Sequence, residues 1–246
     1  MKKTIIFNWK ANIVKTEKAL ELIDIFEKNK DDRFNYIFCV PSCYYYLFKE
    51  NLGAQNIFWL NRGSYTGEIT SEMLKEFNVD LVLLGHLERK VYFCEDNCMI
   101  NNKVKHALKN NFETVLCIGE HTKRTDEDNT SFRIKKILFK QLSECLSGIK
   151  PEEVKKLSIA YEPVDNIGKS DALNSDQLLK IQENIRTWLE VRFGKEISQK
   201  IKFYYGGSIS SKNVNDYLKF VDGVLVGTSS VNPTKFKSLL KNLINY

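Results

Sequence analysis

Long apolar runs are missing from this 246-residue sequence. It has no window of about 18 apolar residues and no basic stretch followed by an apolar one at its start, so it predicts neither a transmembrane helix nor a secretory signal peptide. We therefore expect a soluble, cytoplasmic protein. Linkers rich in proline, glycine or serine are also missing, which favours one domain over residues 1–246.

Metal-binding patterns are equally scarce among the cysteines. Two Cys-x₃-Cys pairs occur, but each lies within or beside a predicted helix or strand, and no histidine shares their spacing. We expect reduced, packed thiols and no metal ion. The six cysteines are Cys39, Cys43, Cys94, Cys98, Cys117 and Cys145.

Basic residues outnumber acidic ones, and the formal net charge is +6. This excess suits an anionic ligand. Lysine and arginine are nevertheless spread along predicted helices and are not clustered with aromatic residues, as they are in nucleic-acid-binding proteins. We therefore expect neither a nucleic acid nor a membrane as a partner.

Short β-rich runs alternate with longer helical patterns along the whole chain. Eight such units without a break in composition predict a closed (β/α)₈ barrel, with an open doubly wound sheet as the alternative. The expected strands are 4–8, 36–40, 56–60, 81–85, 114–118, 157–161, 201–205 and 222–226. The expected helices are 16–29, 42–52, 70–77, 97–110, 130–147, 175–193, 210–219 and 233–244.

The helix over 175–193 carries the clearest local signals. Asn174 and Gln177 have the spacing of a capping box at its start. Its apolar residues recur at helical spacing and predict one packed face, which leaves Lys180, Glu183 and Arg186 directed outward. Pro233 similarly fits the first turn of the helix over 233–244.

Three apolar runs each end in polar or ionisable residues. They lead into Asn8 and Lys10, into His86, and into Glu162 followed by a proline. In parallel α/β folds the carboxyl ends of the strands hold the active site. These side chains are therefore candidates for chemistry.

Six ordered motifs at these strand ends resemble triosephosphate isomerase over nearly the whole chain. Any one would be weak evidence, whereas six in the right order are strong. They read NWK at 8–10, GHLER at 85–89, CIGE at 117–120, AYEPV at 160–164, YGGS at 205–208 and DGVLVG at 222–227.

The resemblance implies isomerisation of an α-hydroxy ketone and aldehyde, with no cofactor. Glu162 would be the base, and His86 the electrophile as a neutral imidazole whose pKa is lowered by the helix that follows, a pairing for which triosephosphate isomerase is the known example. Lys10 would supply positive charge and Asn8 a neutral donor, and Glu88 is the second glutamate beside the lysine. Cys117 is expected to pack beneath the site.

Two further sets of residues follow from the resemblance. Backbone N–H groups would bind the substrate phosphate at Gly168, Ser208, Gly227 and Thr228. A protruding third loop that inserts into a second subunit would make a homodimer, through Gln55, Thr66, Gly67 and Glu68.

The chain departs from the family at the site itself. Leu87 stands where a serine is usual after the histidine, and the lid segment 163–171 reads PVDNIGKSD where the family has PVWAIGTGK. Asp165 replaces a large aromatic residue and adds a negative charge near the proposed base. We expect slower isomerisation and more loss of phosphate from the enediolate, which yields methylglyoxal.

Two other functions remain open. The altered lid is compatible with an isomerase of another small phosphorylated ketose, such as a tetrulose phosphate. A non-catalytic binding protein on a barrel scaffold is the other class, because fold alone does not determine function. The joint presence of Asn8, Lys10, His86 and Glu162 argues against that class.

Overall fold

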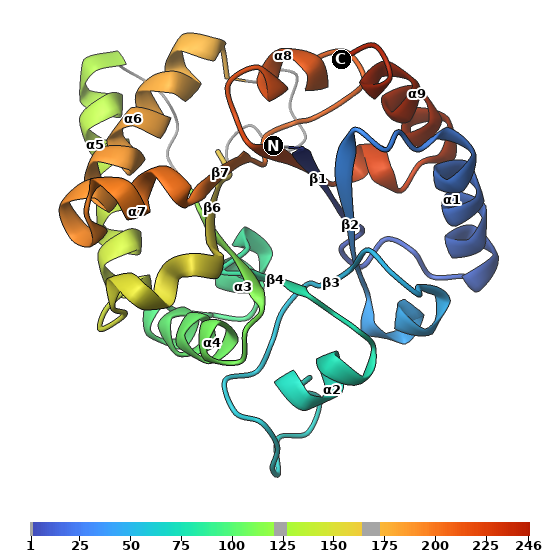
Figure 1. Cartoon of the computed structure of the whole chain (residues 1–246), viewed down its shortest axis with the longest axis horizontal. Coiled ribbons are helices and arrows are strands. Elements are labelled where there is room, and N and C mark those ends of the chain that lie inside the picture. Colours follow the sequence, from blue (N-terminus) through green and yellow to red (C-terminus); the bar gives the residue numbers. More distant parts are fainter. Residues whose placement is uncertain (1, 121–126, 164–172) are drawn as a thin grey trace.

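The computed structural model describes residues 2–120, 127–163 and 173–246, in which eight parallel strands form a closed barrel. β1 pairs with both β2 and β8, and this pairing closes the ring seen at the centre of Figure 1. The strands are β1 Lys3–Asn8, β2 Phe34–Val40, β3 Leu52–Ala54, β4 Leu81–Leu84, β5 Glu113–Ile118, β6 Leu157–Tyr161, β7 Lys202–Tyr205 and β8 Gly223–Val226. The predicted (β/α)₈ barrel is confirmed, and the open sheet is wrong.

Helices surround the strands on the outside of the ring (Figure 1). The α-helices are α1 Thr16–Asn29, α2 Ser71–Glu76, α3 Leu87–Tyr92, α4 Asn97–Lys109, α5 Glu127–Cys145, α6 Ser175–Phe193, α7 Lys195–Lys200, α8 Val214–Leu218 and α9 Pro233–Leu243. Short 3₁₀ helices are η1 Ser42–Leu47, η2 Pro151–Lys156 and η4 Thr228–Ser230.

Both faces of the strands are buried, which is why they read as continuous apolar runs. Alternate side chains fill the barrel interior, and their neighbours pack outward against the helices. The interior cluster comprises Ile6, Cys39, Leu81, Leu83, Val115, Cys117, Ala160, Tyr204 and Leu225.

Side-chain caps set the starts of two long helices where the sequence predicts them. The side chain of Asn174 accepts a 2.9 Å hydrogen bond from the backbone N–H of Gln177, and the capping box of α6 is complete. At α9, Asn232 accepts a 3.0 Å bond from the backbone of Lys235 while Pro233 occupies the first turn. The predicted starts of both helices are confirmed.

The outward direction predicted for Arg186 on α6 is wrong. Its guanidinium donates to the backbone carbonyls of Ser198 and Ile201 and lies 3.5 Å from Asp222, so it ties α6 to α7 and to the start of β8. Helical spacing gives the direction of a side chain on its own helix. It does not reveal the carbonyls that α7 brings to meet it.

The third strand is the largest error in the predicted elements, because β3 lies upstream of the expected range 56–60. Gly53 lies so close to β2 that a Cβ there would be 2.7 Å from Cys39 Sγ, and a strand with glycine at its centre has a weak apolar signal. The apolar run after it is a buried anchor instead. Phe58 donates its backbone N–H to Ile69 at 2.9 Å across the segment between β3 and α2.

Other boundaries also differ from prediction. The helix expected over 42–52 is only the 3₁₀ helix η1, which ends at Leu47, and the helix expected over 210–219 shortens to α8. α3 and α7 are additional. Each of these two helices has only six residues, too short to show a clear helical period.

A buried ion cluster joins the loop before α4 to the segment after β3. The Glu95 carboxylate lies 2.5 Å from Arg89 Nε and 2.9 Å from Lys103 Nζ. Lys103 also donates a 2.9 Å hydrogen bond to the side chain of Asn56. Because Lys103 and Glu95 are almost completely buried, each charge depends on its partners.

Candidate active site

The candidate catalytic residues all follow strands of the barrel. Asn8 is the last residue of β1, Lys10 comes two residues later, His86 comes two residues after β4, and Glu162 follows β6 directly. Parallel strands of a closed barrel end at the same rim, so these four positions share one mouth. The side-chain contacts show how closely they meet there.

Glu162 and His86 face each other inside this mouth. Glu162 Oε1 lies 3.1 Å from His86 Nε2, and the two side chains are only 5% and 8% exposed. The backbone N–H of Glu162 donates to the carbonyl of Ile118 at 2.9 Å, which extends the pairing of β6 with β5 by one residue. A carboxylate is therefore held against an imidazole in a site with little water.

Two glycines give Glu162 its room. A Cβ on Gly206 would lie 2.7 Å from Glu162 Cγ, and a Cβ on Gly119 would lie 1.9 Å from its carbonyl oxygen. The sequence places Gly119 and Gly206 in two of the six motifs but does not predict that they make room for Glu162. The signal was present, since both glycines directly follow apolar strands.

Glu88 links the two cationic groups of the site. One carboxylate oxygen contacts His86 Nδ1 and the other contacts Lys10 Nζ. Burial works against its charge, but the contacts with His86 and then Lys10 dominate and lower the pKa of Glu88 to about 2. Glu88 is thus a charged bridge between His86 and Lys10.

The expectation that the following helix lowers the pKa of His86 is wrong for this structure, because two carboxylates contact the ring. Burial does disfavour the imidazolium, but the carboxylates of Glu162 and Glu88 outweigh burial and raise the pKa of His86 to about 9. The helix that follows, α3, has only six residues, so its dipole is small beside two carboxylates in direct contact. The two carboxylates therefore favour the imidazolium form of His86.

The backbone of Lys10 is fixed by hydrogen bonds to two neighbouring side chains. It has a φ of 50°, and its N–H donates a 3.0 Å hydrogen bond to the side-chain oxygen of Asn8. Gln55 Nε2 donates 3.0 Å bonds to the carbonyls of Lys10 and Cys39. Asn8 therefore accepts a bond from Lys10 here, and Gln55, which the sequence assigned to the dimer loop, supports Lys10 within its own chain.

The proposed phosphate residues lie on two loops of the same mouth. A Cβ on Gly227 would be 3.7 Å from Lys10 Cε, which places the loop after β8 beside the lysine. Thr228 begins η4 and is exposed, and Ser208 is half-buried on the loop after β7. A 2.8 Å bond from Ser229 Oγ to the carbonyl of Ile209 joins these loops. Gly168 and the lid residue Asp165 lie outside the described residues.

Cys117 lies in the floor of the barrel below this site. It is about 1% exposed, and burial followed by the charge of Glu162 raises the pKa of its thiol well above the ordinary value. A thiol in this environment stays protonated. The expectation that it packs beneath the site is confirmed.

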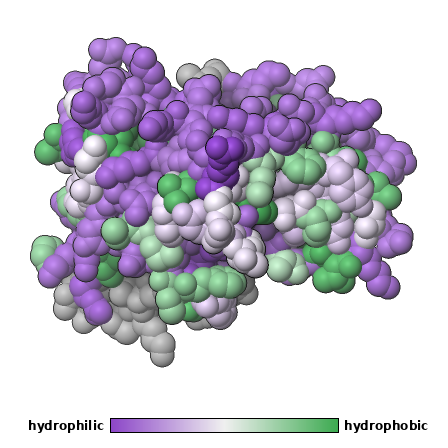
Figure 2. Space-filling view, turned by 90° about the horizontal axis from the view of Figure 1, so that it is seen from below, coloured by the Kyte–Doolittle hydropathy of each residue, from purple (hydrophilic) through white to green (hydrophobic). Residues whose placement is uncertain are grey.

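The protruding segment, residues 60–67, is exposed throughout and extends from the body at the foot of Figure 1, between β3 and α2. It contains Thr66 and Gly67, and Glu68 follows it. Apolar side chains are exposed on and near this side, and Figure 2 shows green and white surface among purple on the face seen from below. The exposed apolar residues of the protruding segment, and of η1, α2 and α3 with the residues that directly follow α2 and α3, include Tyr46, Leu60, Tyr65, Met73, Phe77, Tyr92 and Phe93.

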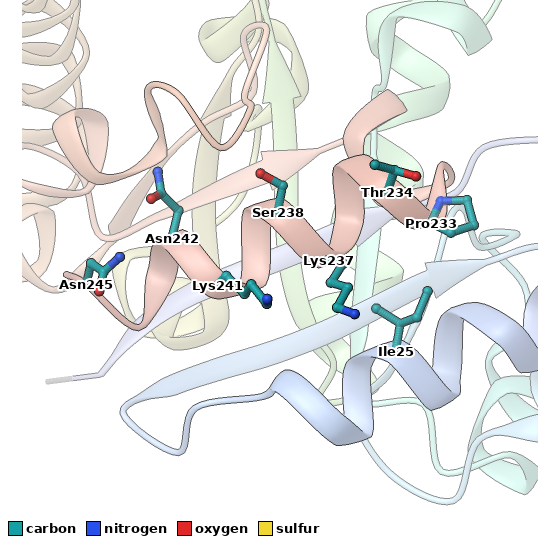
Figure 3. Close-up of a pocket in the computed structure, with 8 residues that line it drawn as sticks. All are labelled: Ile25, Pro233, Thr234, Lys237, Ser238, Lys241, Asn242 and Asn245. Carbon is teal, nitrogen blue, oxygen red and sulfur yellow. The ribbon is translucent and has the colours of Figure 1, made fainter.

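An open hollow of about 530 Å³ lies elsewhere, between α1 and α9 (Figure 3). It is lined by Ile25, Pro233, Thr234, Lys237, Ser238, Lys241, Asn242 and Asn245. None of these residues contacts the cluster around Glu162. The candidate site is therefore identified by its side chains and not by cavity size.

Metal-binding clusters and membrane-spanning helices are both absent from residues 2–120, 127–163 and 173–246. In this part of the chain, no three His, Cys, Asp or Glu side chains are grouped so that they would hold a metal ion. No helix within it has the length and apolar character needed to cross a membrane.

The family and its relatives match the chain almost from end to end. The sequence profile of the family described as triosephosphate isomerase covers residues 3–243. A protein named triosephosphate isomerase from Dictyoglomus thermophilum is 34% identical over 98% of this chain and 99% of its own length. Proteins of the same name from Alkaliphilus oremlandii and Clostridium tetani are 34% and 29% identical, over 98% of this chain and 99% and 96% of their own lengths. The chain therefore belongs to the triosephosphate isomerase family and is an enzyme.

Proposed function

We propose that the protein interconverts dihydroxyacetone phosphate and D-glyceraldehyde 3-phosphate. The observation that supports this most directly is the buried contact between the Glu162 carboxylate and the His86 imidazole, joined to Lys10 through Glu88. This arrangement offers a base, an electrophile and a cation at one barrel mouth. A proton transfer next to a carbonyl requires these three groups.

Glu162 acts as the base. Its carboxylate takes a proton from the carbon that bears the hydroxyl, beside the carbonyl, which forms an enediolate. The proton is then delivered to the former carbonyl carbon, while the hydroxyl proton passes to the former carbonyl oxygen, and the isomerisation is complete. Glu162 Oε1 lies 3.1 Å from His86 Nε2, so the substrate must open this contact before its carbon can meet the base.

His86 and Lys10 stabilise the oxygens of the enediolate. Glu162 contributes most to raising the pKa of His86, so a substrate that moves the carboxylate away lowers that pKa again. The imidazole then approaches the neutral form expected from the sequence. Lys10 keeps its charge beside the developing oxyanion and close to the loop of Gly227.

The substrate phosphate binds to backbone N–H groups at Gly168, Ser208, Gly227 and Thr228. The position of Gly227 beside Lys10 supports this, because the lysine then neutralises charge at the edge of the phosphate site. Small residues suit this work, since they let the backbone approach the dianion closely.

The altered lid and Leu87 slow the isomerase and increase its side reaction. Leu87 offers no hydroxyl to hold the resting carboxylate of Glu162, which lies on His86 instead. A lid that closes less often leaves the enediolate exposed for longer. The C–O bond to phosphate then breaks, phosphate leaves, and the remaining enol becomes methylglyoxal.

Methylglyoxal formed per turnover measures this leak. We expect the double variant Asp165→Trp, Leu87→Ser to form less of it than the unchanged enzyme. An equal or higher yield from the double variant would show that these two positions do not cause the leak.

The working enzyme is a homodimer in which the protruding segment of one copy, with Gln55, Thr66 and Glu68 at or near it, inserts beside the site of the other. The exposure of the whole segment and of the nearby aromatic side chains supports this, because a lone soluble chain rarely leaves such apolar surface uncovered. Lys10 and Gln55 lie at the same mouth, so the partner would bear on the site directly.

A coupled assay with glyceraldehyde 3-phosphate tests the proposed activity. We expect Glu162→Gln to lower kcat by about a thousandfold, within the usual range for losing a general base. Glu190→Gln changes an exposed glutamate on α6 and is the matched control, with unchanged activity.

The assay also separates the alternatives. Turnover of a phosphorylated tetrulose without turnover of the triose would assign the altered lid to a longer substrate. Silence on both substrates would favour a binding protein on a barrel scaffold. Full activity in Glu162→Gln would remove Glu162 from the role of base.

A further inference from the structure

A side chain on α5 holds the loop that begins where β5 ends. Gln141 Nε2 donates a 2.7 Å hydrogen bond to the carbonyl of Gly119, and Gln141 Oε1 accepts a 3.0 Å bond from the N–H of the same glycine. A primary amide suits this pairing, because it carries an acceptor and two donors in one plane. One side chain therefore satisfies both backbone polar groups of Gly119.

Strand pairing ends before Gly119. β5 pairs with β4 up to Leu116 and with β6 up to Ile118, and Gly119 is the next residue. Backbone groups of a half-buried residue need partners, and the neighbouring strands no longer offer them at this point. The amide of Gln141 supplies them from a helix instead.

The turn of α5 that carries Gln141 is firmly packed. Leu138 and Leu142, three residues before Gln141 and one after it, are 1% and 0% exposed and belong to the core between the helices and the barrel. Side chains presented by a packed helix are placed more precisely than side chains on loops. Gln141 is therefore a rigid support for the loop.

Gly119 lies directly against the backbone of the proposed base. A Cβ on Gly119 would be 1.9 Å from the carbonyl oxygen of Glu162 and 2.9 Å from its carbonyl carbon. The N–H of Glu162 also donates a 2.9 Å bond to Ile118, the residue before this glycine. Two backbones packed this closely cannot shift independently. A movement of Gly119 is therefore passed on to Glu162.

The residue after Gly119 is tied to the same place from the side of β6. The hydroxyl of Tyr161 donates a 2.8 Å hydrogen bond to Glu120 Oε1, and both residues are buried. Tyr161 is the last residue of β6 and directly precedes Glu162. Residues 119–120 are thus held to α5 by Gln141 and to β6 by Tyr161.

We propose that Gln141 is a positioning residue for the base: its amide fixes Gly119, and Gly119 fixes the backbone from which the Glu162 carboxylate projects. This inference rests on the proposed isomerisation by Glu162. Gln141 takes no part in the proton transfer itself. Without its amide Gly119 can move, and the carboxylate loses the exact placement that proton transfer requires.

Steady-state kinetics of Gln141→Met with glyceraldehyde 3-phosphate test this role. Methionine has a similar length but lacks the donor and the strong acceptor of the amide. We expect kcat to fall about tenfold, since even a displacement of 1 Å costs roughly a hundredfold. KM should not change, because the residues proposed for the phosphate lie on other loops. Lys136→Met changes an exposed lysine of the same helix and is the matched control, with unchanged kcat.

A second pair of variants distinguishes positioning of the base from general support of the fold. In a Glu162→Gln background the base is gone, so adding Gln141→Met should lower the residual activity by no more than about twofold. Gln141→Asn has an amide one carbon shorter that cannot make both bonds, and it should show the same loss of kcat where Gln141→Met does not fold. Circular dichroism and urea unfolding show which variants are folded.

The outcomes separate this inference from the proposed function. An unchanged protein that does not turn over the triose phosphate, or full activity in Glu162→Gln, would overturn the proposed function and this inference with it. Where that function holds, a normal kcat in folded Gln141→Met or Gln141→Asn would overturn the inference alone. An equal loss with and without the Glu162 carboxylate would do the same, because Gln141 would then act elsewhere.

Discussion

Replacing Lys103 with methionine tests whether the buried ion cluster beside α4 acts as a set of coupled charges. Lys103 and Glu95 are 2% and 1% exposed in their side chains, with 2.9 Å between Nζ and Oε2. Removing one partner of such a pair costs about 3–5 kcal/mol, because the other charge stays buried without compensation.

The cluster is asymmetric, so the two single substitutions should differ. After Lys103→Met, Glu95 keeps Arg89 at 2.5 Å, and we expect a loss of about 3 kcal/mol. After Glu95→Met, Lys103 keeps the side-chain oxygen of Asn56 and the ring of Trp59 at 5.9 Å, neither of which is charged, and we expect about 4–5 kcal/mol. The double variant should cost less than Glu95→Met alone, since it leaves no buried charge of the pair.

Urea unfolding at one fixed protein concentration measures these free energies, and the fixed concentration matters because association adds to apparent stability. Lys105→Met, which changes an exposed lysine of the same helix, is the matched control and should stay within about 0.5 kcal/mol. If the double variant lost the sum of the two single losses, or if Lys103→Met cost more than Glu95→Met, the coupling argued here would be refuted.

Four further predictions concern the site. Glu88→Gln should lower the pKa of His86 from about 9 in an NMR titration, because one of its two carboxylate partners loses its charge, and an unchanged pKa would contradict this. Because folding raises the pKa of His86, its protonation stabilises the folded state fully below about pH 6.5, and this contribution is lost as the pH rises toward about 9. The free energy of unfolding of His86→Gln should therefore depend less on pH than that of the unchanged protein. Gly206→Ala should lower kcat by about a hundredfold with the fold retained, because its methyl group would displace Glu162, and a kcat within about twofold would exclude that displacement. Gln55→Leu removes two 3.0 Å hydrogen bonds to backbone carbonyls and should lower kcat/KM by about tenfold, with a normal rate as the contrary result.

Local sequence signals predicted the elements that depend on local physics. The capping box at Asn174 and the proline at position 233 set the starts of α6 and α9, and strands buried on both faces revealed themselves as apolar runs. The third strand was missed because β3 has three residues with glycine at the centre, while the more apolar run after it anchors a loop. Packing against β2, and not the pattern along the chain, makes that strand.

At the site, sequence could predict which residues gather but not how they are paired. The resemblance placed Lys10, His86 and Glu162 at strand ends, and the closed barrel brings their positions to one mouth. The raised pKa of His86 follows from two carboxylates contacting opposite sides of one ring, a matter of rotamers that no spacing reveals. The bonds from Gln55 to two carbonyls are equally invisible to motif reading.

The pairing of β1 with β8 also has a consequence for synthesis of the chain. Lys10 comes from the first strand unit and its neighbour Gly227 from the last, so the mouth is assembled only when the ring closes. At ordinary translation rates roughly 10–40 s separate the synthesis of these two positions. Contacts so distant in sequence form slowly, and until they do the loop of Gly227 is not in place beside Lys10. An unfinished chain therefore has the ionisable residues of the site without the last loop of the mouth.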